Sequence, residues 1–303
     1  MDFLHKALER AKAKKTPPEE GRPAPAPQAP APQTAPSPTG AAAPLGEIRY
    51  SRTRTVPVDA GRLRSQRIVT GASDDPVGEA YKLLRTHIVQ RTKADNQNLL
   101  MLTGPRAGEG KTLTAVNLAI SLSQEVDKTV LLVDADLRRP TVHEYLGLPP
   151  GPGLVDYLSG SQTIPELLVH PEGFPKFVVL PGGRPVSEAA ELISSPMMVE
   201  LVEELKHFYA DRYVIFDLPP MLAFADALAF APLVDGIVLV VEMGKTPRED
   251  IQRSLGLLQD FPVLGTVLNK VEGTDHGYYS YPDYAKHNEQ PAAKNCWWKW
   301  FRR

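Results

Sequence analysis

A glycine-rich stretch from Gly104 to Thr112, Gly-Pro-Arg-Ala-Gly-Glu-Gly-Lys-Thr, has the residue types that bind a phosphate chain. Gly108 and Gly110 let the backbone approach phosphate oxygens, and the first N–H groups of a following helix favour an anion. Lys111 supplies a charge for the β- and γ-phosphates, and the Thr112 hydroxyl is placed to bind Mg²⁺. The alternative is a glycine-rich turn with an incidental Lys-Thr pair. The apolar strand before the loop and the helical pattern after it favour phosphate binding.

Three carboxylates stand directly after apolar runs. Asp134 and Asp136 follow Val130–Val133, and Asp217 ends the run that begins at Tyr213. Two carboxylates at positions i and i+2 past a strand can act together on a nucleotide and its metal, and a strand that ends in Asp is the usual form of a metal-binding acid. Such residues can instead only cap the next helix. Because the phosphate-binding stretch lies upstream, the pattern favours a metal site.

The elements that must position these residues alternate along the chain. Strands are predicted over Leu99–Thr103, Val130–Val133, Phe177–Leu180, Tyr213–Phe216, Gly236–Val241 and Val263–Leu268, and helices over Val77–Thr92, Lys111–Gln124, Met197–Tyr209 and Arg248–Gln259. Continuous Val, Ile and Leu in the strands indicates a mostly parallel sheet buried on both faces. We therefore predict an α/β fold, a three-layer P-loop NTPase domain with ligand at the carboxyl ends of the strands.

Composition separates this domain from its flanks. Ten of the 30 prolines lie between Pro17 and Pro44, and a stretch with so few large apolar side chains cannot offset the entropy of ordering itself. We expect an amphipathic segment at 1–15, a disordered linker at 16–74 that is Pro/Ala-rich and then Arg-rich, the folded domain at 75–272, and a tail at 273–303.

Charge and cysteine content narrow the function further. A net charge of −2 gives no general reason to expect nucleic-acid binding. Cys296 is the only cysteine, which excludes an intrachain disulfide. Neither a signal-peptide pattern nor an apolar run of membrane-spanning length is present, so we expect a cytoplasmic location.

The tail carries two unusual clusters. Four of the ten tyrosines stand within seven polar residues, namely Tyr278, Tyr279, Tyr281 and Tyr284. A flexible tail of this kind can carry phenols into the active site of a neighbour; the alternative is an aromatic binding patch. The chain then ends in Trp297, Trp298, Trp300 and Phe301 beside Lys299, Arg302 and Arg303. This composition suits either the interface of an anionic membrane or a groove on a partner protein.

The order of the motifs resembles that of the bacterial tyrosine kinases (BY-kinases). The phosphate-binding stretch is followed by Val-Asp-Ala-Asp-Leu-Arg-Arg-Pro at 133–140, Phe-Asp-Leu-Pro-Pro at 216–220 and the tyrosine cluster. The resemblance extends from about Glu79 to Tyr284. The chain looks like the stand-alone cytoplasmic kind and is similar to the CpsD/CapB-type and exosortase-associated autokinases of polysaccharide export.

This resemblance implies an ATP- and Mg²⁺-dependent protein-tyrosine autokinase that regulates exopolysaccharide or capsule synthesis and export. Its acceptors would be the four tail tyrosines, phosphorylated between molecules. The implied nucleotide-binding residues are Gly108, Glu109, Gly110, Lys111, Thr112, Leu113 and Asn269, the last near the adenine. The implied Mg²⁺ ligands are Thr112, Asp134 and Asp217. The implied catalytic residues are Lys111, Asp134, Asp136 and Asp217, with Asp134 also receiving the proton of the tyrosine.

The resemblance also implies partners. Glu79, Lys82 and Arg85 match the Glu-x-x-Arg-x-x-Arg oligomerisation motif of the family, and predict a homo-oligomer. Lys82 replaces the first Arg and lacks its planar fork, which weakens that prediction. Relatives without membrane spans are activated by a separate membrane-spanning polysaccharide co-polymerase, so we expect such an activator and a peripheral position at the inner face of the cell membrane.

Two further positions depart from the family pattern. Leu218 stands where the family usually has Ser or Thr, and Pro105 occupies the usual first glycine position of the phosphate-binding stretch. Arg106 stands where partition- and division-site-type ATPases carry a signature lysine. Such an ATPase switch is the nearest alternative function, and a non-catalytic nucleotide-binding adaptor is a third.

Overall fold

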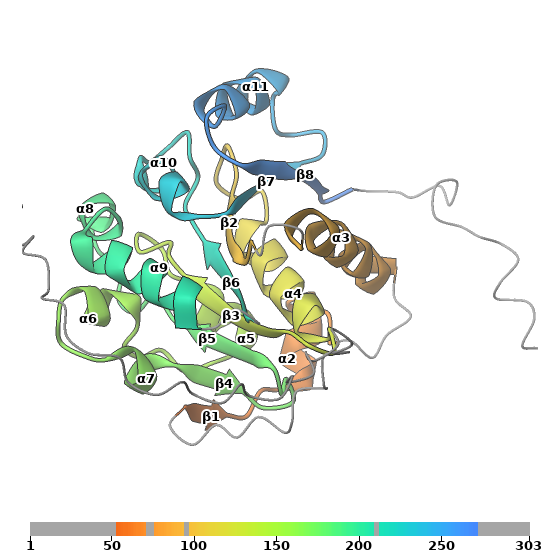
Figure 1. The fold of residues 1–303 in the computed structure, drawn as a ribbon. Coiled ribbons are helices and arrows are strands. Elements are labelled where there is room, and N and C mark those ends of the chain that lie inside the picture. The colour runs from red at the N-terminus through yellow and green to blue at the C-terminus, as the bar shows by residue number, and fades with distance from the viewer. Residues whose placement is uncertain (1–52, 71–75, 94–96, 209–211, 272–303) are drawn as a thin grey trace, which may run out of the picture. The chain divides into compact units, whose positions relative to one another are not determined.

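The computed structural model describes residues 53–70, 76–93, 97–208 and 212–271 of the 303-residue chain. The amphipathic N-terminal segment, the tyrosine cluster and the Trp-rich end lie outside these residues. The described part contains an eight-stranded sheet in the order β1-β4-β5-β3-β6-β2-β7-β8 (Figure 1). The strands are β1 (Arg54–Val56), β2 (Leu99–Thr103), β3 (Thr129–Asp134), β4 (Val169–Pro171), β5 (Phe177–Leu180), β6 (Arg212–Asp217), β7 (Gly236–Glu242) and β8 (Val263–Asn269). Every neighbouring pair is parallel except β4 and β5.

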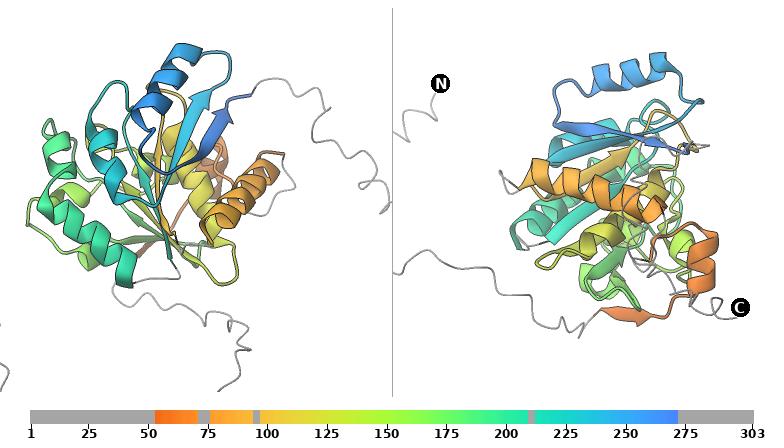
Figure 2. Two further views of the ribbon diagram at one scale, coloured as in Figure 1. Left: turned by 45° about the horizontal axis from the view of Figure 1, so that its top comes forward. Right: turned by 90° about the vertical axis from the view of Figure 1, so that its right-hand side faces the viewer.

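Helices cover both faces of this sheet, as the ribbon views show (Figure 2). One buried cluster lies under α2 (Ala60–Ser65), α3 (Pro76–Thr92), α4 (Lys111–Ser123) and α5 (Val142–Leu146). The other lies under α6 (Leu154–Leu158), α7 (Ile164–Leu167), α8 (Ala189–Ile193), α9 (Pro196–Phe208), α10 (Asp226–Phe230), a short 3-10 turn (Ala231–Leu233) and α11 (Arg248–Leu257). Alternate side chains of β2 enter opposite clusters, as a doubly buried strand requires. The three-layer α/β prediction is confirmed.

The predicted elements agree closely with those observed. Strands β2 and β5 have the predicted bounds, and the ends of the other predicted strands differ by one residue. Helix α9 begins at Pro196, and Ser195 Oγ accepts a hydrogen bond from Met198 N–H at 3.3 Å, which makes Ser195 its N-cap. No helix in the described ranges is both long enough and apolar enough to cross a bilayer.

Residues 53–70 correct the expected domain boundary. The sequence prediction placed them in the linker that ends at residue 74, but β1 pairs with β4 and α2 packs on the domain. Leu63 and Ile68 are buried in the core. Val69 N–H donates to Asn117 Oδ1 of α4 at 2.9 Å. The described fold therefore includes part of the Arg-rich stretch, because strand pairing, two buried apolar side chains and a hydrogen bond to α4 attach it to the domain.

Candidate active site

Polar residues gather where five neighbouring strands end. The P-loop, defined here as residues 104–112, follows β2, while Asp134, Asp217, Glu242 and Asn269 end β3, β6, β7 and β8 respectively. Asp134 and Asp217 are register partners on adjacent strands. Thr112 Oγ1 donates to Asp217 Oδ2 at 2.6 Å. The structure thus brings together Thr112 and two of the three acids that the sequence singled out, at the edge expected for a ligand.

The P-loop backbone has the form of an anion cradle. Gly108 and Gly110 have φ of +85° and +89°, a region that residues with a Cβ rarely adopt. A Cβ at Gly110 would also lie 2.1 Å from Asn269 Nδ2. Within the described residues, the N–H groups of residues 108–113 have no hydrogen-bond acceptor. These donors at the start of α4 fit a polyphosphate.

Lys111 is the first residue of α4 and its charge lies inside the site. The residue is only 7% exposed, and its Nζ donates to the carbonyl oxygen of Arg106 at 3.3 Å. An ammonium group has three donors, and burying it with a single carbonyl contact leaves it poorly compensated. A bound phosphate would supply the missing acceptors.

Asp134 and Asp217 are both buried and each has one oxygen without a partner. Asp134 Oδ2 accepts from Val142 N–H at 2.9 Å, and Asp217 Oδ2 accepts from Thr112. The Oδ1 atom of each has no donor among the described residues. Burial raises the pKa of both carboxyls, to about 7 for Asp217, and repulsion from Asp217 raises the pKa of Asp134 further.

This pair fits a divalent cation. Two adjacent buried carboxylates repel one another unless a positive charge lies between them, and hard oxygen ligands suit Mg²⁺. The described residues hold no group of three or more His, Cys, Asp or Glu side chains that could bind a metal by themselves. A magnesium ion here would therefore use the Thr112 hydroxyl, these carboxylates, water and nucleotide oxygens, as Mg²⁺ in phosphate sites commonly does.

Asp136 and Arg138 lie on the loop that leaves β3. Asp136 is half-buried, which raises the pKa of its carboxyl, and its Oδ1 accepts from Arg139 N–H at 3.0 Å. Arg138 pairs with the buried Asp226 through two contacts of 2.9 and 3.3 Å, and its guanidinium lies 4.4 Å from the ring centre of Phe224. This ion pair joins the loop after β3 to α10, and sequence reasoning missed it.

Glu109 serves the P-loop itself. Its buried carboxylate accepts from Arg106 N–H at 2.9 Å and from Thr246 Oγ1 at 2.7 Å. Burial raises its pKa. The Arg106 guanidinium, which stands at the signature position of the partition-type ATPases, pairs with Asp250 of α11. The side chain of Glu109 thus fixes the loop from within, although the sequence analysis assigned the residue to the nucleotide.

The remaining predicted site residues contact other residues of the same chain. Asn269, expected near the adenine, donates through Nδ2 to the carbonyl oxygen of Glu109 at 2.9 Å. Leu113 packs against the core beneath α4, and Leu218 is buried in the opposite core. The side chain of Leu218 therefore contributes packing and cannot hydrogen-bond at the position that follows Asp217.

The predicted oligomerisation residues also pair within the chain. Glu79 and Lys82 form an exposed ion pair of 2.6 Å one turn apart on α3. Arg85 lies 2.8 Å from Glu125 and donates to the carbonyl oxygen of Ser121 at 3.0 Å, so it holds α3 on α4. The oligomerisation role of these residues stays a prediction.

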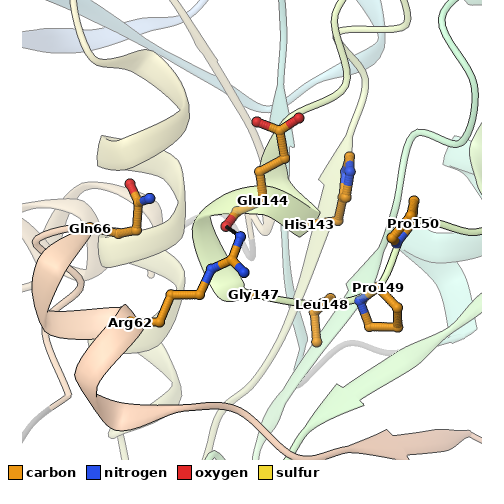
Figure 3. Close-up of a pocket in the computed structure, with 8 residues that line it drawn as sticks. All are labelled: Arg62, Gln66, His143, Glu144, Gly147, Leu148, Pro149 and Pro150. Atoms are coloured by element: carbon orange, nitrogen blue, oxygen red, sulfur yellow. Dashed lines mark hydrogen bonds between the residues drawn. The ribbon is translucent and has the colours of Figure 1, made fainter.

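A hollow of about 650 Å³ lies away from the P-loop, between α2 and α5 (Figure 3). Its lining includes Arg62, Gln66, His143, Glu144 and Leu148. Arg62 Nη2 donates to the carbonyl oxygen of Glu144 at 3.3 Å, so the arginine helps to attach α2 to the domain. None of the predicted site residues lines this hollow.

Together, the parallel sheet, the P-loop and the paired acids define a nucleotide-binding protein of the P-loop class. The family described as the CobQ/CobB/MinD/ParA nucleotide binding domain matches residues 100–296. Within this class, the chain belongs to the bacterial tyrosine-protein kinases. It is 37% identical to tyrosine-protein kinase YwqD of Bacillus subtilis over 67% of this chain and 85% of YwqD.

Two further comparisons agree. The chain is 32% identical to the succinoglycan biosynthesis transport protein ExoP of Rhizobium meliloti over 72% of its own length and 28% of ExoP. The kinase domain of Escherichia coli tyrosine kinase ETK superposes with a TM-score of 0.63 at 30% identity, covering 75% of this chain and 92% of that domain. Several of the curated relatives are much longer than the match, and the chain spans only 28–31% of their length.

Proposed function

We propose that the protein is an ATP- and Mg²⁺-dependent protein-tyrosine kinase. The observation that carries the proposal is the pair of buried carboxylates, Asp134 and Asp217, each with one unpartnered oxygen beside a P-loop that ends in Lys111 and Thr112. Membership of the tyrosine-protein kinase family supports a phenol as the acceptor.

The reaction moves the γ-phosphoryl group from ATP to a tyrosine hydroxyl. The bond between the γ-phosphorus and the β,γ-bridging oxygen breaks, a bond from the phenolic oxygen to that phosphorus forms, and ADP leaves. Lys111 stabilises charge on the transferring oxygens. Mg²⁺, held by Thr112, Asp134 and Asp217, would neutralise the phosphates when bound. We assign to Asp134 the role of accepting the phenolic proton, because its Oδ1 has no donor among the described residues.

The acceptors we propose are Tyr278, Tyr279, Tyr281 and Tyr284, used between molecules. A Lys111→Met chain with an intact tail is mixed with a chain in which the four tyrosines are replaced by Phe. Only transfer between molecules can label the Lys111→Met chain, and we expect an anti-phosphotyrosine blot to detect it. Each phosphate adds about −1.5 to −2 charge, so heavy labelling should also favour release from an assembly.

The control for this mixture is a Lys111→Met chain that also carries the four Phe replacements, which should stay unlabelled. The proposal is wrong if the intact-tailed chain stays unlabelled in a mixture whose two components co-purify.

We further propose that the protein acts in exopolysaccharide or capsule export, as a homo-oligomer, beside a membrane-spanning co-polymerase at the inner face of the cell membrane. The name of ExoP, a transport protein of succinoglycan biosynthesis, supports the polysaccharide assignment. The support for membrane contact is the composition of the last eight residues, with three Trp, one Phe and three cations.

Removal of residues 296–303 is expected to weaken binding to anionic vesicles by about a hundredfold. Each cation near an anionic leaflet contributes about 1 kcal/mol, and three are lost together with the interfacial aromatic side chains. Co-sedimentation at low and high salt measures this, and the effect should shrink as salt rises. The matched control replaces Lys299, Arg302 and Arg303 by Gln and keeps the tryptophans. Equal vesicle binding by the truncated and full chains would contradict membrane contact through this tail.

A further inference from the structure

The P-loop is contacted by the residue that ends β8 and by the one directly after it. Lys270, directly after β8, donates through Nζ to the carbonyl oxygen of Gly108 at 2.6 Å. The same ammonium lies 3.0 Å from Glu242 Oε2, at the end of β7. We infer that Lys270, held in place by Glu242, is a positioning residue that sets the P-loop backbone for nucleotide phosphates. This inference rests on the proposed nucleotide-binding function.

Peptide geometry explains how a contact to a carbonyl can act on the nucleotide. In a trans peptide the C=O and the following N–H point in opposite directions. Lys270 binds the carbonyl of Gly108, and Asn269 Nδ2 binds the carbonyl of Glu109 at 2.9 Å. The N–H groups of Glu109 and Gly110 are therefore turned away from Lys270 and Asn269. Successive N–H groups turned in this way form an anion-binding concavity.

Lys270 itself has an unusual backbone conformation. Its φ is +56°, a left-handed value that is uncommon for a residue with a Cβ. Asn269 Oδ1 accepts the Lys270 N–H at 2.9 Å and supports this turn. The neighbouring residues Asn269 and Lys270 thereby reach two consecutive carbonyls of the P-loop.

Glu242 restrains the partly exposed side chain of Lys270. A lysine side chain at the surface is flexible and strongly hydrated, so a single carbonyl would hold it weakly. Glu242 is mostly buried, and it pairs with Lys270 through Oε2 and with Lys245 Nζ through Oε1 at 2.7 Å. Its backbone N–H donates to Thr246 Oγ1, the hydroxyl that contacts Glu109. The turn after β7 thus supports both the lysine and the interior of the P-loop.

Replacement of Glu242 by Gln distinguishes a positioning role of this residue from an effect of its charge alone. If Glu242 affected nucleotide binding only through its negative charge, Glu242→Gln would remove that charge and tighten the binding of an anionic nucleotide. If Glu242 holds Lys270 against Gly108, the same change frees the lysine and weakens binding. The two roles predict opposite signs for one isosteric substitution.

The test measures the affinity of the full chain for Mg-ADP by isothermal titration calorimetry. We expect Lys270→Met and Glu242→Gln each to weaken binding by about tenfold, the size expected for the loss of a charge-assisted hydrogen bond. The double variant should be no weaker than Lys270→Met alone, because both changes break one linkage. Lys270→Arg, which keeps a cationic donor, should recover part of the affinity.

Lys245→Met is the matched control. It removes a cation from the same carboxylate, and the Lys245 side chain is 76% exposed, so we expect less than about a threefold change. The inference is overturned if Lys270→Met binds Mg-ADP as the wild type does, if Glu242→Gln binds more tightly, or if Lys245→Met matches Lys270→Met. A wild-type chain that does not bind Mg-ADP would overturn the proposed function itself, and this inference with it.

Discussion

Lys111→Met is expected to lower tyrosine labelling by at least about a hundredfold while the fold is retained. Removing one group that stabilises transition-state charge in a buried site costs about 10²–10³ in rate. The lysine is buried but its ammonium contacts only one carbonyl oxygen of the described residues, so its loss removes little packing. Methionine has a similar length and no charge. An anti-phosphotyrosine blot with ATP and Mg²⁺ measures the effect, and circular dichroism measures the fold.

Lys128→Met provides the matched control. Lys128 directly precedes β3, so it lies at the amino ends of the strands, opposite the P-loop. This change should leave labelling within about twofold, as surface substitutions usually do. Labelling of pure, folded Lys111→Met at the wild-type level, in the same assay, would exclude the P-loop as the site of phosphoryl transfer.

The core of the fold was predictable because its strands are continuous apolar runs. β2 and β5 read as Leu-Leu-Met-Leu-Thr and Phe-Val-Val-Leu, patterns that are typical of strands buried on both faces. The P-loop was predictable for a related reason. Gly108 and Gly110 require positive φ, and only glycine adopts it readily.

The packing of residues 53–70 could not be predicted from composition. The stretch has four arginines and a single aspartate, and such an excess of one charge is typical of a solvated linker. The segment is attached by contacts distant in sequence: β1 pairs with β4, Leu63 and Ile68 are buried, and Val69 N–H donates to Asn117. Two apolar residues five positions apart carry too weak a periodic signal to outweigh the surrounding charge.

Contacts between residues far apart in the chain could not be predicted from the sequence either. Thr246 binds Glu109 across 137 positions, and Lys270 binds Gly108 across 162. A single threonine or lysine so far along the chain forms no recognisable sequence motif with the P-loop residue that it contacts. Glu242 did have a signal, because it ends a continuous apolar strand as Asp134 and Asp217 do.

The placement of Asp134 opposite Asp217 implies a conflict between stability and function. Register on adjacent strands puts two buried carboxyls side by side, each with an oxygen that the described protein leaves unpartnered. Buried charges without compensation destabilise a fold. A site of this kind gains its compensation from a bound cation and nucleotide, so the empty protein is less stable than its packing alone would allow.

Asp217→Asn is therefore expected to abolish activity and to stabilise the nucleotide-free protein. We expect labelling to fall by at least about a hundredfold and to lose its dependence on Mg²⁺ concentration, because a metal-binding charge is removed. The amide oxygen can still accept the Thr112 hydroxyl, so the local hydrogen bond is retained. Urea unfolding without metal at pH 8 should show a larger free energy of unfolding for Asp217→Asn than for wild type.

The pH dependence of the free energy of unfolding tests whether the buried carboxyl of Asp217 causes the difference in stability. Burial raises the pKa of Asp217 from 3.8 to about 7, so the folded state holds this proton more tightly than the unfolded state. The contribution of Asp217 to the stability of the metal-free wild type should therefore decline as the pH rises from about 4 to about 7, by at most about 4 kcal/mol, and stay constant above that range. In Asp217→Asn that part of the decline should be absent. Asp127→Asn, the same change at an exposed position, should keep the wild-type profile. A metal-free Asp217→Asn chain less stable than wild type at pH 8 would show that the buried carboxyl is not the source of the instability.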